Sequence, residues 1–102
     1  MGVYNRQMKT LIKKKAARRL KIIAGQIQGL QKMIEKEKYC IDILNQSMAI
    51  KSALSGVEDL ILENHLSTHV IEQVKSGQKE KAVKEILTVY KLSKRKWATL
   101  YP

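Results

Sequence analysis

Three side chains in this chain of 102 residues have the chemistry to hold a soft transition metal. Cys40 is the only cysteine, and His65 and His69 are the only histidines. On a helix, two histidines four residues apart share one face and can grip one ion. A thiolate with two imidazoles suits Cu(I), Zn(II), Ni(II) or Co(II) and excludes a hard Mg or Ca site. The spacing also permits another interpretation, in which the histidines are ordinary surface residues and Cys40 is a small buried hydrophobe.

The separation of these residues restricts how they can meet. Cys40 and His65 are 25 residues apart, which is about 37 Å along one continuous helix. Metal–ligand bonds are only about 2.0–2.3 Å long, so one straight helix cannot bring them together. Two such helices running antiparallel in a dimer can do so. Cys40 of one subunit then faces His65 and His69 of the other, and twofold symmetry repeats the site.

Helical periodicity predicts an all-α fold around these residues. The only proline is Pro102, the last residue, so the body of the chain has almost no helix breakers. We expect three helices, over about 8–37, 41–75 and 79–97. Gly77 follows the second helix as a C′ cap. One clear apolar stripe on the first helix has members spaced three and four residues apart: Leu20, Ile23, Ile27, Leu30 and Ile34.

Length and composition indicate one folded domain. We assign residues 1–102 to it, with a basic N-terminal arm over about 1–15. An apolar fraction of 44% argues against disorder. The long middle helix has more apolar surface than one short neighbour can cover, so we expect an antiparallel helical bundle formed by oligomerisation. The sequence has neither a membrane-spanning apolar run nor a signal-peptide apolar region, and we expect a cytoplasmic protein.

The charge distribution indicates an acidic partner. The chain has 20 Lys and Arg residues against 9 Asp and Glu, a net charge of +11. Residues 1–34 contain nine of the basic residues and no acidic one, which favours nucleic-acid binding. A solvated basic surface or a membrane-surface helix are the alternatives. No helix-turn-helix, zinc-finger or RNA-binding aromatic motif is present, so phosphate contacts from a helical surface are expected. Charge and placement select four candidates for them: Lys14, Lys15, Arg18 and Lys51.

Several segments together resemble the CsoR/RcnR family of small bacterial metal-responsive repressors. The resemblance covers about residues 16–90. It includes a cysteine, a histidine 25 residues later and a third ligand four residues after that. The other matching residues are Arg19-Leu20-Lys21, Gly25-Gln26, Gly29, Tyr39-Cys40-Ile41-Asp42-Ile43-Leu44, Gln46 to Leu54, and Glu63-Asn64-His65-Leu66.

The resemblance implies a three-helix chain that forms dimers and then a homotetramer. Such a protein is a repressor and not an enzyme, and effector binding at an intersubunit site lowers its affinity for operator DNA. The resemblance assigns Cys40, His65 and His69 to the metal and Arg19 to a DNA contact. It assigns Tyr39 and Glu85 to a hydrogen-bond network around the metal-bound histidine.

The sequence departs from the family's copper pattern at one ligand. Copper sensors of the family carry Cys-His-Cys, whereas His69 stands in the third position here. Nickel and cobalt sensors carry Cys-His-His with a further N-terminal histidine, and Met8 occupies that position. We therefore expect Cu(I), with Zn(II), Ni(II) or Co(II) as alternatives.

The resemblance also allows effectors other than a metal. The formaldehyde-sensing branch of the family uses the same cysteine as a nucleophile and remains an alternative. The persulfide-sensing branch needs a second cysteine and is disfavoured. More distant alternatives are a nucleic-acid-binding protein without an effector and a thiol sensor acting through Cys40.

Overall fold

The computed structural model describes residues 8–94, which contain helices and no strand. The helices are α1 (Thr10–Glu35), α2 (Cys40–Ser67), α3 (His69–Lys75) and α4 (Lys79–Lys94). This confirms the predicted all-α fold class. The chain divides into two compact units, residues 7–64 and a second unit that includes residues 65–102. Residues 95–97 of the last predicted helix, and residues 1–7 of the predicted basic arm, lie outside the described part.

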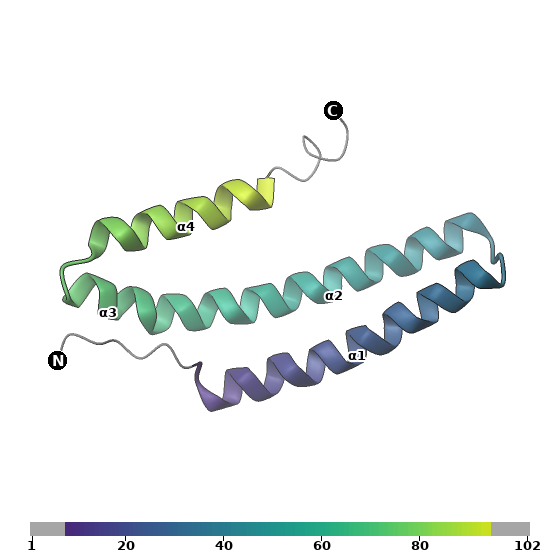
Figure 1. The fold of residues 1–102 in the computed structure, drawn as a ribbon, viewed down its shortest axis with the longest axis horizontal. Coiled ribbons are helices and arrows are strands. Elements are labelled where there is room, and N and C mark those ends of the chain that lie inside the picture. The colour runs from purple at the N-terminus through teal and green to yellow at the C-terminus, as the bar shows by residue number, and fades with distance from the viewer. Residues whose placement is uncertain (1–7, 95–102) are drawn as a thin grey trace. The chain divides into compact units, whose positions relative to one another are not determined.

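In the first unit, α1 and α2 lie side by side and antiparallel (Figure 1). The buried core is a narrow seam in which α1 contributes Ala16 and Ile23, and α2 contributes Ile50 and Val57. Each pair is seven residues apart, the repeat that keeps one side of a helix facing its partner in a coiled-coil-like pair. Leu30 continues the repeat on α1 and packs against the same core.

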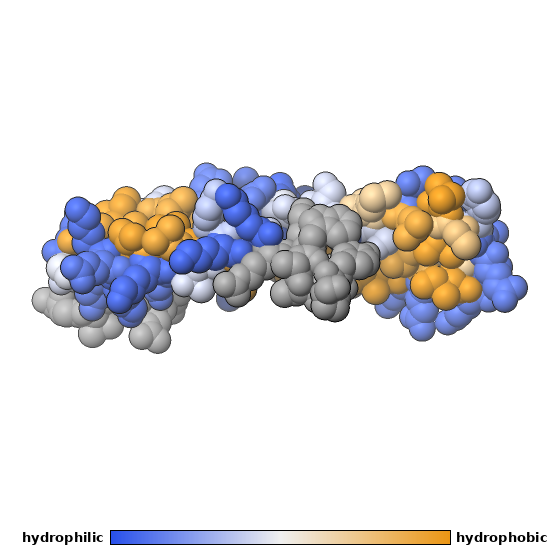
Figure 2. Space-filling view, turned by 90° about the horizontal axis from the view of Figure 1, so that it is seen from above, coloured by the Kyte–Doolittle hydropathy of each residue, from blue (hydrophilic) through white to orange (hydrophobic). Residues whose placement is uncertain are grey.

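The apolar stripe predicted for α1 is only partly correct. Ile23 is buried, but Leu20, Ile27 and Ile34 are 45%, 51% and 57% exposed within the single chain. The reason is that one neighbouring helix covers only a narrow seam, so the flanking apolar positions stay uncovered. Figure 2, the view from above Figure 1, shows hydrophobic surface gathered in patches on the face that it presents.

The turn between α1 and α2 has the Schellman geometry without a glycine. Lys38 N–H donates to Met33 C=O at 3.0 Å, and Glu37 N–H donates to Ile34 C=O at 3.0 Å. These bonds satisfy carbonyls that the end of a helix otherwise leaves open. Glu37 takes the left-handed conformation that the motif requires, with φ 53°.

In the second unit, α3 and α4 form a shorter hairpin whose turn contains Gly77. Gly77 has φ 82°. Its N–H donates to Val74 C=O at 3.3 Å, and Gln78 N–H donates to Gln73 C=O at 2.6 Å. The predicted glycine C′ cap is confirmed.

Thr68 divides the predicted middle helix, residues 41–75, into α2 and α3. Its φ of −127° and ψ of −75° depart from helical values. A β-branched side chain loses rotamer freedom against the preceding turn, so threonine weakens a helix at such a point. The interruption is confined to this residue, because Glu72 N–H still donates to Thr68 C=O at 3.0 Å.

Candidate metal centre and DNA-binding surface

His65 and His69 lie on either side of the interruption at Thr68, and their rings are in contact. Their ring centroids are 5.4 Å apart, in an edge-to-face arrangement with an interplanar angle of 77°. Two imidazoles sharing one ion through nitrogens at about 2.0–2.1 Å would have their centroids about 5 Å apart. Both side chains are half-buried. The pair therefore has the separation that two ligands of one metal ion need.

Cys40 is the first residue of α2 and is a free, exposed thiol. His65 lies in the last turn of the same helix. Within residues 8–94, no three Cys, His, Asp or Glu side chains are grouped closely enough to hold a metal ion. One copy of this part of the chain thus provides a histidine pair and a separate thiol, but not a complete site.

Glu85 accepts a hydrogen bond from Gln73, which is the most deeply buried polar residue described. Gln73 Nε2 donates to Glu85 Oε1 at 2.9 Å. Gln73 has no exposed surface, and its Oε1 accepts no hydrogen bond within residues 8–94. Gln73 stands four residues after His69 in α3. The contact links the element that begins with His69 to α4.

Tyr39, the other residue expected around the metal, precedes α2. Its carbonyl accepts hydrogen bonds from the N–H groups of Asp42 and Ile43, at 3.0 and 3.2 Å. Its side chain is 70% exposed. Tyr39 therefore serves the start of α2 through its backbone, while its phenol is available to a partner.

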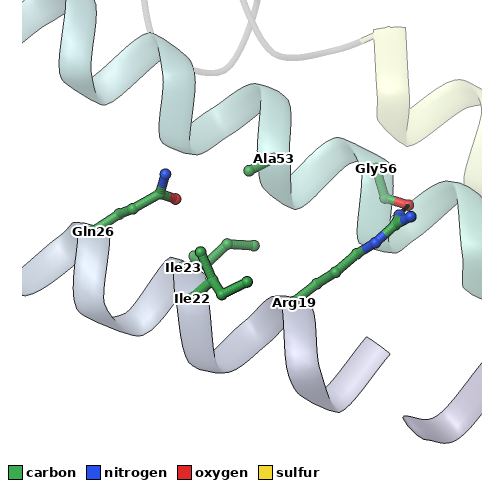
Figure 3. A pocket seen from close by; sticks show the side chains of 6 residues that line it. All are labelled: Arg19, Ile22, Ile23, Gln26, Ala53 and Gly56. Carbon is green, nitrogen blue, oxygen red and sulfur yellow. Dashed lines mark hydrogen bonds between the residues drawn. The ribbon is translucent and has the colours of Figure 1, made fainter. Parts of the chain in front are cut away.

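The basic candidates on α1 occupy two adjacent stripes of one exposed helix. Lys14 and Arg18 are four residues apart and lie away from the Ala16–Ile23 seam, whereas Lys15 and Arg19 form a stripe beside it. The Arg19 guanidinium reaches across to α2, where Nη1 donates to Gly56 C=O at 3.5 Å (Figure 3). Lys51 is exposed on α2.

Arg19 also borders a small groove between α1 and α2. The groove has a volume of about 260 Å³ and is lined by Ile22, Ile23, Gln26, Ala53 and Gly56 in addition to Arg19 (Figure 3). Its lining is mostly apolar, and the guanidinium closes one end. Arg19 is exposed, as are Lys14, Lys15 and Arg18, but among these four only its guanidinium donates a hydrogen bond to α2 within the described residues.

Comparison with known proteins assigns the chain to a family. Residues 12–91 match the family model described as metal-sensitive transcriptional repressor. The chain belongs to this repressor family. It is 44% identical over 73 residues to the copper-sensing transcriptional repressor CsoR of Bacillus subtilis, covering 72% of each chain. It is 32% identical over 84 residues to the CsoR of Mycobacterium tuberculosis H37Rv, covering 82% of this chain and 71% of that one.

A solved structure supports the same assignment. The crystal structure of the copper-sensing repressor CsoR with Cu(I) from Geobacillus thermodenitrificans matches this repressor with a TM-score of 0.80. The identity is 36%, and the match covers 87% of this chain and 93% of that chain. The resemblance to the CsoR/RcnR family is confirmed, and with it the expectation of a repressor rather than an enzyme.

Membership of a family of transcriptional repressors implies a DNA partner and an assembly of subunits. Uncovered apolar side chains on the repressor agree with an assembly. Near Cys40, Ile41, Leu44 and Met48 are 50%, 55% and 55% exposed. None of the helices within residues 8–94 is both long and apolar enough to cross a membrane.

Sequence reasoning missed Gln73 in this repressor. Glutamine in an amphipathic helix is ordinarily a surface residue, and no motif marks this one. The available signal was its spacing, because His65, His69 and Gln73 follow one another at intervals of four. Their shared face was visible in the sequence, but the burial of Gln73 was not.

Proposed function

We propose that this protein is a cytoplasmic copper-sensing repressor that binds operator DNA as a homotetramer and releases it on binding Cu(I). The ligands are Cys40 of one subunit with His65 and His69 of the partner subunit. The observation that carries the proposal is the close pair of histidine rings, with centroids 5.4 Å apart, on a chain whose only thiol is at the opposite end of α2 from His65. Copper sensing in the relatives supports the choice of metal.

The donor set suits Cu(I). A thiolate is a soft ligand, imidazole binds copper well, and Cu(I) accepts three ligands. The absence of an N-terminal histidine, with Met8 in its position, argues against the larger ligand set expected for nickel or cobalt.

Helical register supports an intersubunit site. Residues 25 apart are separated by about seven turns of an α-helix, so they project from nearly the same side. Two α2 helices packed antiparallel through that side would bring Cys40 of each to His65 of the partner subunit. The exposed Ile41 and Leu44 would then be covered by the partner subunit's Leu62 and Leu66, which are 36% and 42% exposed in one chain.

The proposed DNA-binding residues are Lys14, Lys15, Arg18, Arg19 and Lys51. Their exposure on α1 and α2 supports contacts to phosphates, which dominate affinity and make it depend on salt. Neutralising one contacting residue, as in Lys14→Ala, should reduce the slope of log affinity against log salt by about 1. An unchanged slope would remove that residue from the interface.

The first test is anaerobic fluorescence anisotropy of the protein on DNA from upstream of its own gene. Separate titrations use Cu(I), Ni(II), Co(II), Zn(II) and formaldehyde. Release by one Cu(I) per subunit is expected, with Cys40→Ala and His65→Ala unresponsive and Ser55→Ala, on the same helix, unchanged. Release only by another metal, or by formaldehyde, would replace copper as the effector. Bound DNA that no effector releases would identify a binder without an effector.

A mixing experiment tests the shared site. Cys40→Ala and His65→Ala subunits each lack a complete site. Mixed dimers regain one, so an equal mixture that exchanges freely should recover about one quarter of the wild-type Cu(I) sites. A site confined to one subunit would recover none.

A further inference from the structure

Gln73, in the α3–α4 hairpin, has a side-chain amide whose NH₂ group is hydrogen-bonded and whose carbonyl oxygen is unsatisfied. Its side chain has no exposed surface. Nε2 donates to Glu85 Oε1 at 2.9 Å, whereas Oε1 accepts nothing within residues 8–94. An ionised carboxylate only accepts hydrogen bonds. The NH₂ group must therefore face Glu85, and the carbonyl oxygen must point the other way.

An unmet buried acceptor is uncommon and has a free-energy cost. Folded proteins pair nearly all buried polar atoms, and leaving one unpaired costs about 1–3 kcal/mol. The surface of this oxygen is inaccessible, so solvent does not compensate. A donor that approached Gln73 Oε1 in another state of the protein would relieve the cost and favour that state.

His69 is placed to supply that donor. It begins α3, and Gln73 follows it by four residues, which puts their Cβ atoms about 5–6 Å apart on one face. A metal-bound imidazole uses one nitrogen for the metal, and the other nitrogen then carries a hydrogen that needs an acceptor. A cysteine at this position would have no second donor to offer.

We propose that Gln73 is the positioning residue that joins metal-bound His69 to Glu85, with the His69 N–H donating to Gln73 Oε1 while Nε2 keeps Glu85. The inference rests on the function proposed above, in which His69 is a ligand. It identifies a route from the metal to α4 that depends on histidine in the third ligand position. Ser76 Oγ, which donates to Gln73 C=O at 3.2 Å, helps to hold the same residue through its backbone.

The backbone of Gln73 extends this connection into the turn. Gln73 C=O accepts the Gln78 N–H that closes the Schellman motif. A His69 N–H bound to Gln73 Oε1 would therefore connect to Glu85 through the side-chain amide, while the backbone carbonyl fixes Gln73 to the turn. The hairpin offers a discrete element that the effector can bias.

The test compares Gln73→Met with Gln78→Met, the same substitution at an exposed glutamine five residues away. Two quantities are measured anaerobically on the full chain: Cu(I) stoichiometry and affinity, and the factor by which Cu(I) lowers DNA affinity. For Gln73→Met we expect one Cu(I) per subunit to be retained and the allosteric factor to fall at least tenfold. Gln78→Met should retain both.

Repeating the Gln73→Met comparison in a His69→Cys protein tests whether His69 is the hydrogen-bond donor. His69→Cys retains a soft ligand but removes the second ring nitrogen, so Gln73→Met added to it should cause no further loss of the allosteric factor. An equal loss in both backgrounds, or no loss in either, would refute the relay. If Cu(I) did not lower the DNA affinity of the unsubstituted protein, the proposed function would be wrong. The proposed contact between His69 and Gln73 would then have no role in sensing.

A spectroscopic measurement on the unsubstituted protein depends neither on DNA nor on the folding of a variant, and His69→Cys serves as its control. The side-chain amide resonances of Gln73, in the unsubstituted ¹⁵N-labelled protein, should shift when Cu(I) is added, because Oε1 gains a donor. In His69→Cys they should stay near their copper-free positions. An unshifted Gln73 amide in copper-loaded unsubstituted protein would refute the contact.

Discussion

The two helical hairpins differ in what they bury. The α1–α2 hairpin buries an apolar seam of Ala16, Ile23, Ile50 and Val57. The α3–α4 hairpin buries Ala82, which is 1% exposed, and Gln73, which has no exposed surface. The side chains of an apolar seam make no hydrogen bonds, so they have no hydrogen-bond partners that could differ between two states of the protein. A buried amide with one unmet acceptor has a second arrangement available, so the shorter hairpin is the better place for a switch.

The turns of the two hairpins make a second contrast. Both end the preceding helix with the same pair of backbone hydrogen bonds, and both need one residue with positive φ. Gly77 fills that position in one turn and Glu37 in the other. Because the geometry is shared, substitutions at these two positions test backbone strain with little change in packing.

The largest effect is expected in the apolar seam. Ile23→Ala removes a buried side chain, 4% exposed, and should lower the free energy of unfolding by about 3 kcal/mol. Urea denaturation at fixed protomer concentration measures it, since assembly contributes to stability. Gln28→Ala, an exposed position on the same helix, should change it by less than about 0.5 kcal/mol. Similar losses for both would mean that the seam is not the core of the first hairpin.

The next effect is expected at Gly77. Gly77→Ala should destabilise the protein by about 1–2 kcal/mol, because an L residue is strained at φ 82°. An added Cβ would meet no atom within 4 Å, so the loss reports the backbone alone. Thermal unfolding measures it, and Gly77→Asn should recover part of the loss because asparagine tolerates this conformation. Equal stability of all three proteins would show that the turn does not hold positive φ in solution.

The reverse substitution in the other turn should stabilise. Glu37→Gly should raise the free energy of unfolding by about 0.5–1 kcal/mol, since relief of strain exceeds the added freedom of the unfolded chain. Glu37→Ala is the control, because it removes the same charge without relieving the backbone strain. It should not raise the free energy of unfolding. A gain for alanine equal to that for glycine would attribute the effect to charge.

The turns also show what the sequence could reveal. Gly77 marked the end of α3 because glycine is the usual residue at positive φ. The segment Glu35 to Cys40 has no glycine or proline, so the sequence marks the first turn only weakly. The end of α1 is fixed by backbone hydrogen bonds to Met33 C=O and Ile34 C=O, which do not depend on the side chains. Thr68, which divides α2 from α3, likewise carries no strong helix-stop signal.

The candidate metal ligands were predictable for a different reason. Their residue types are rare in this chain, and their spacing restricts the ways in which they can meet. Burial was not predictable in the same way. Leu20 and Ile27 look as apolar as Ile23, but a single neighbouring helix covers one and leaves the others exposed. Gln73 is buried and bonded to Glu85 of α4, which is a tertiary contact that the sequence pattern does not reveal.

The smallest effect on stability, and the sharpest contrast, is expected for Gln73→Met without metal. Methionine is similar in volume to glutamine, so little cavity should form. The substitution removes the bond to the Glu85 carboxylate, worth about 1.5–3 kcal/mol, and also the unsatisfied Oε1, whose cost is about 1–3 kcal/mol. These terms oppose each other, and the net change in the free energy of unfolding should stay within about 1 kcal/mol of zero, against about 3 kcal/mol for Ile23→Ala.

Urea denaturation of the metal-free protein measures this, with Gln73→Ala as the comparison. Alanine removes the same polar atoms but leaves a cavity, and should cost about 2 kcal/mol more than methionine. A loss of about 3 kcal/mol for Gln73→Met would mean that Oε1 already has a donor in the folded, metal-free protein. The second hairpin would then be as fixed as the first, and it would have no unmet acceptor for a metal-bound histidine to relieve.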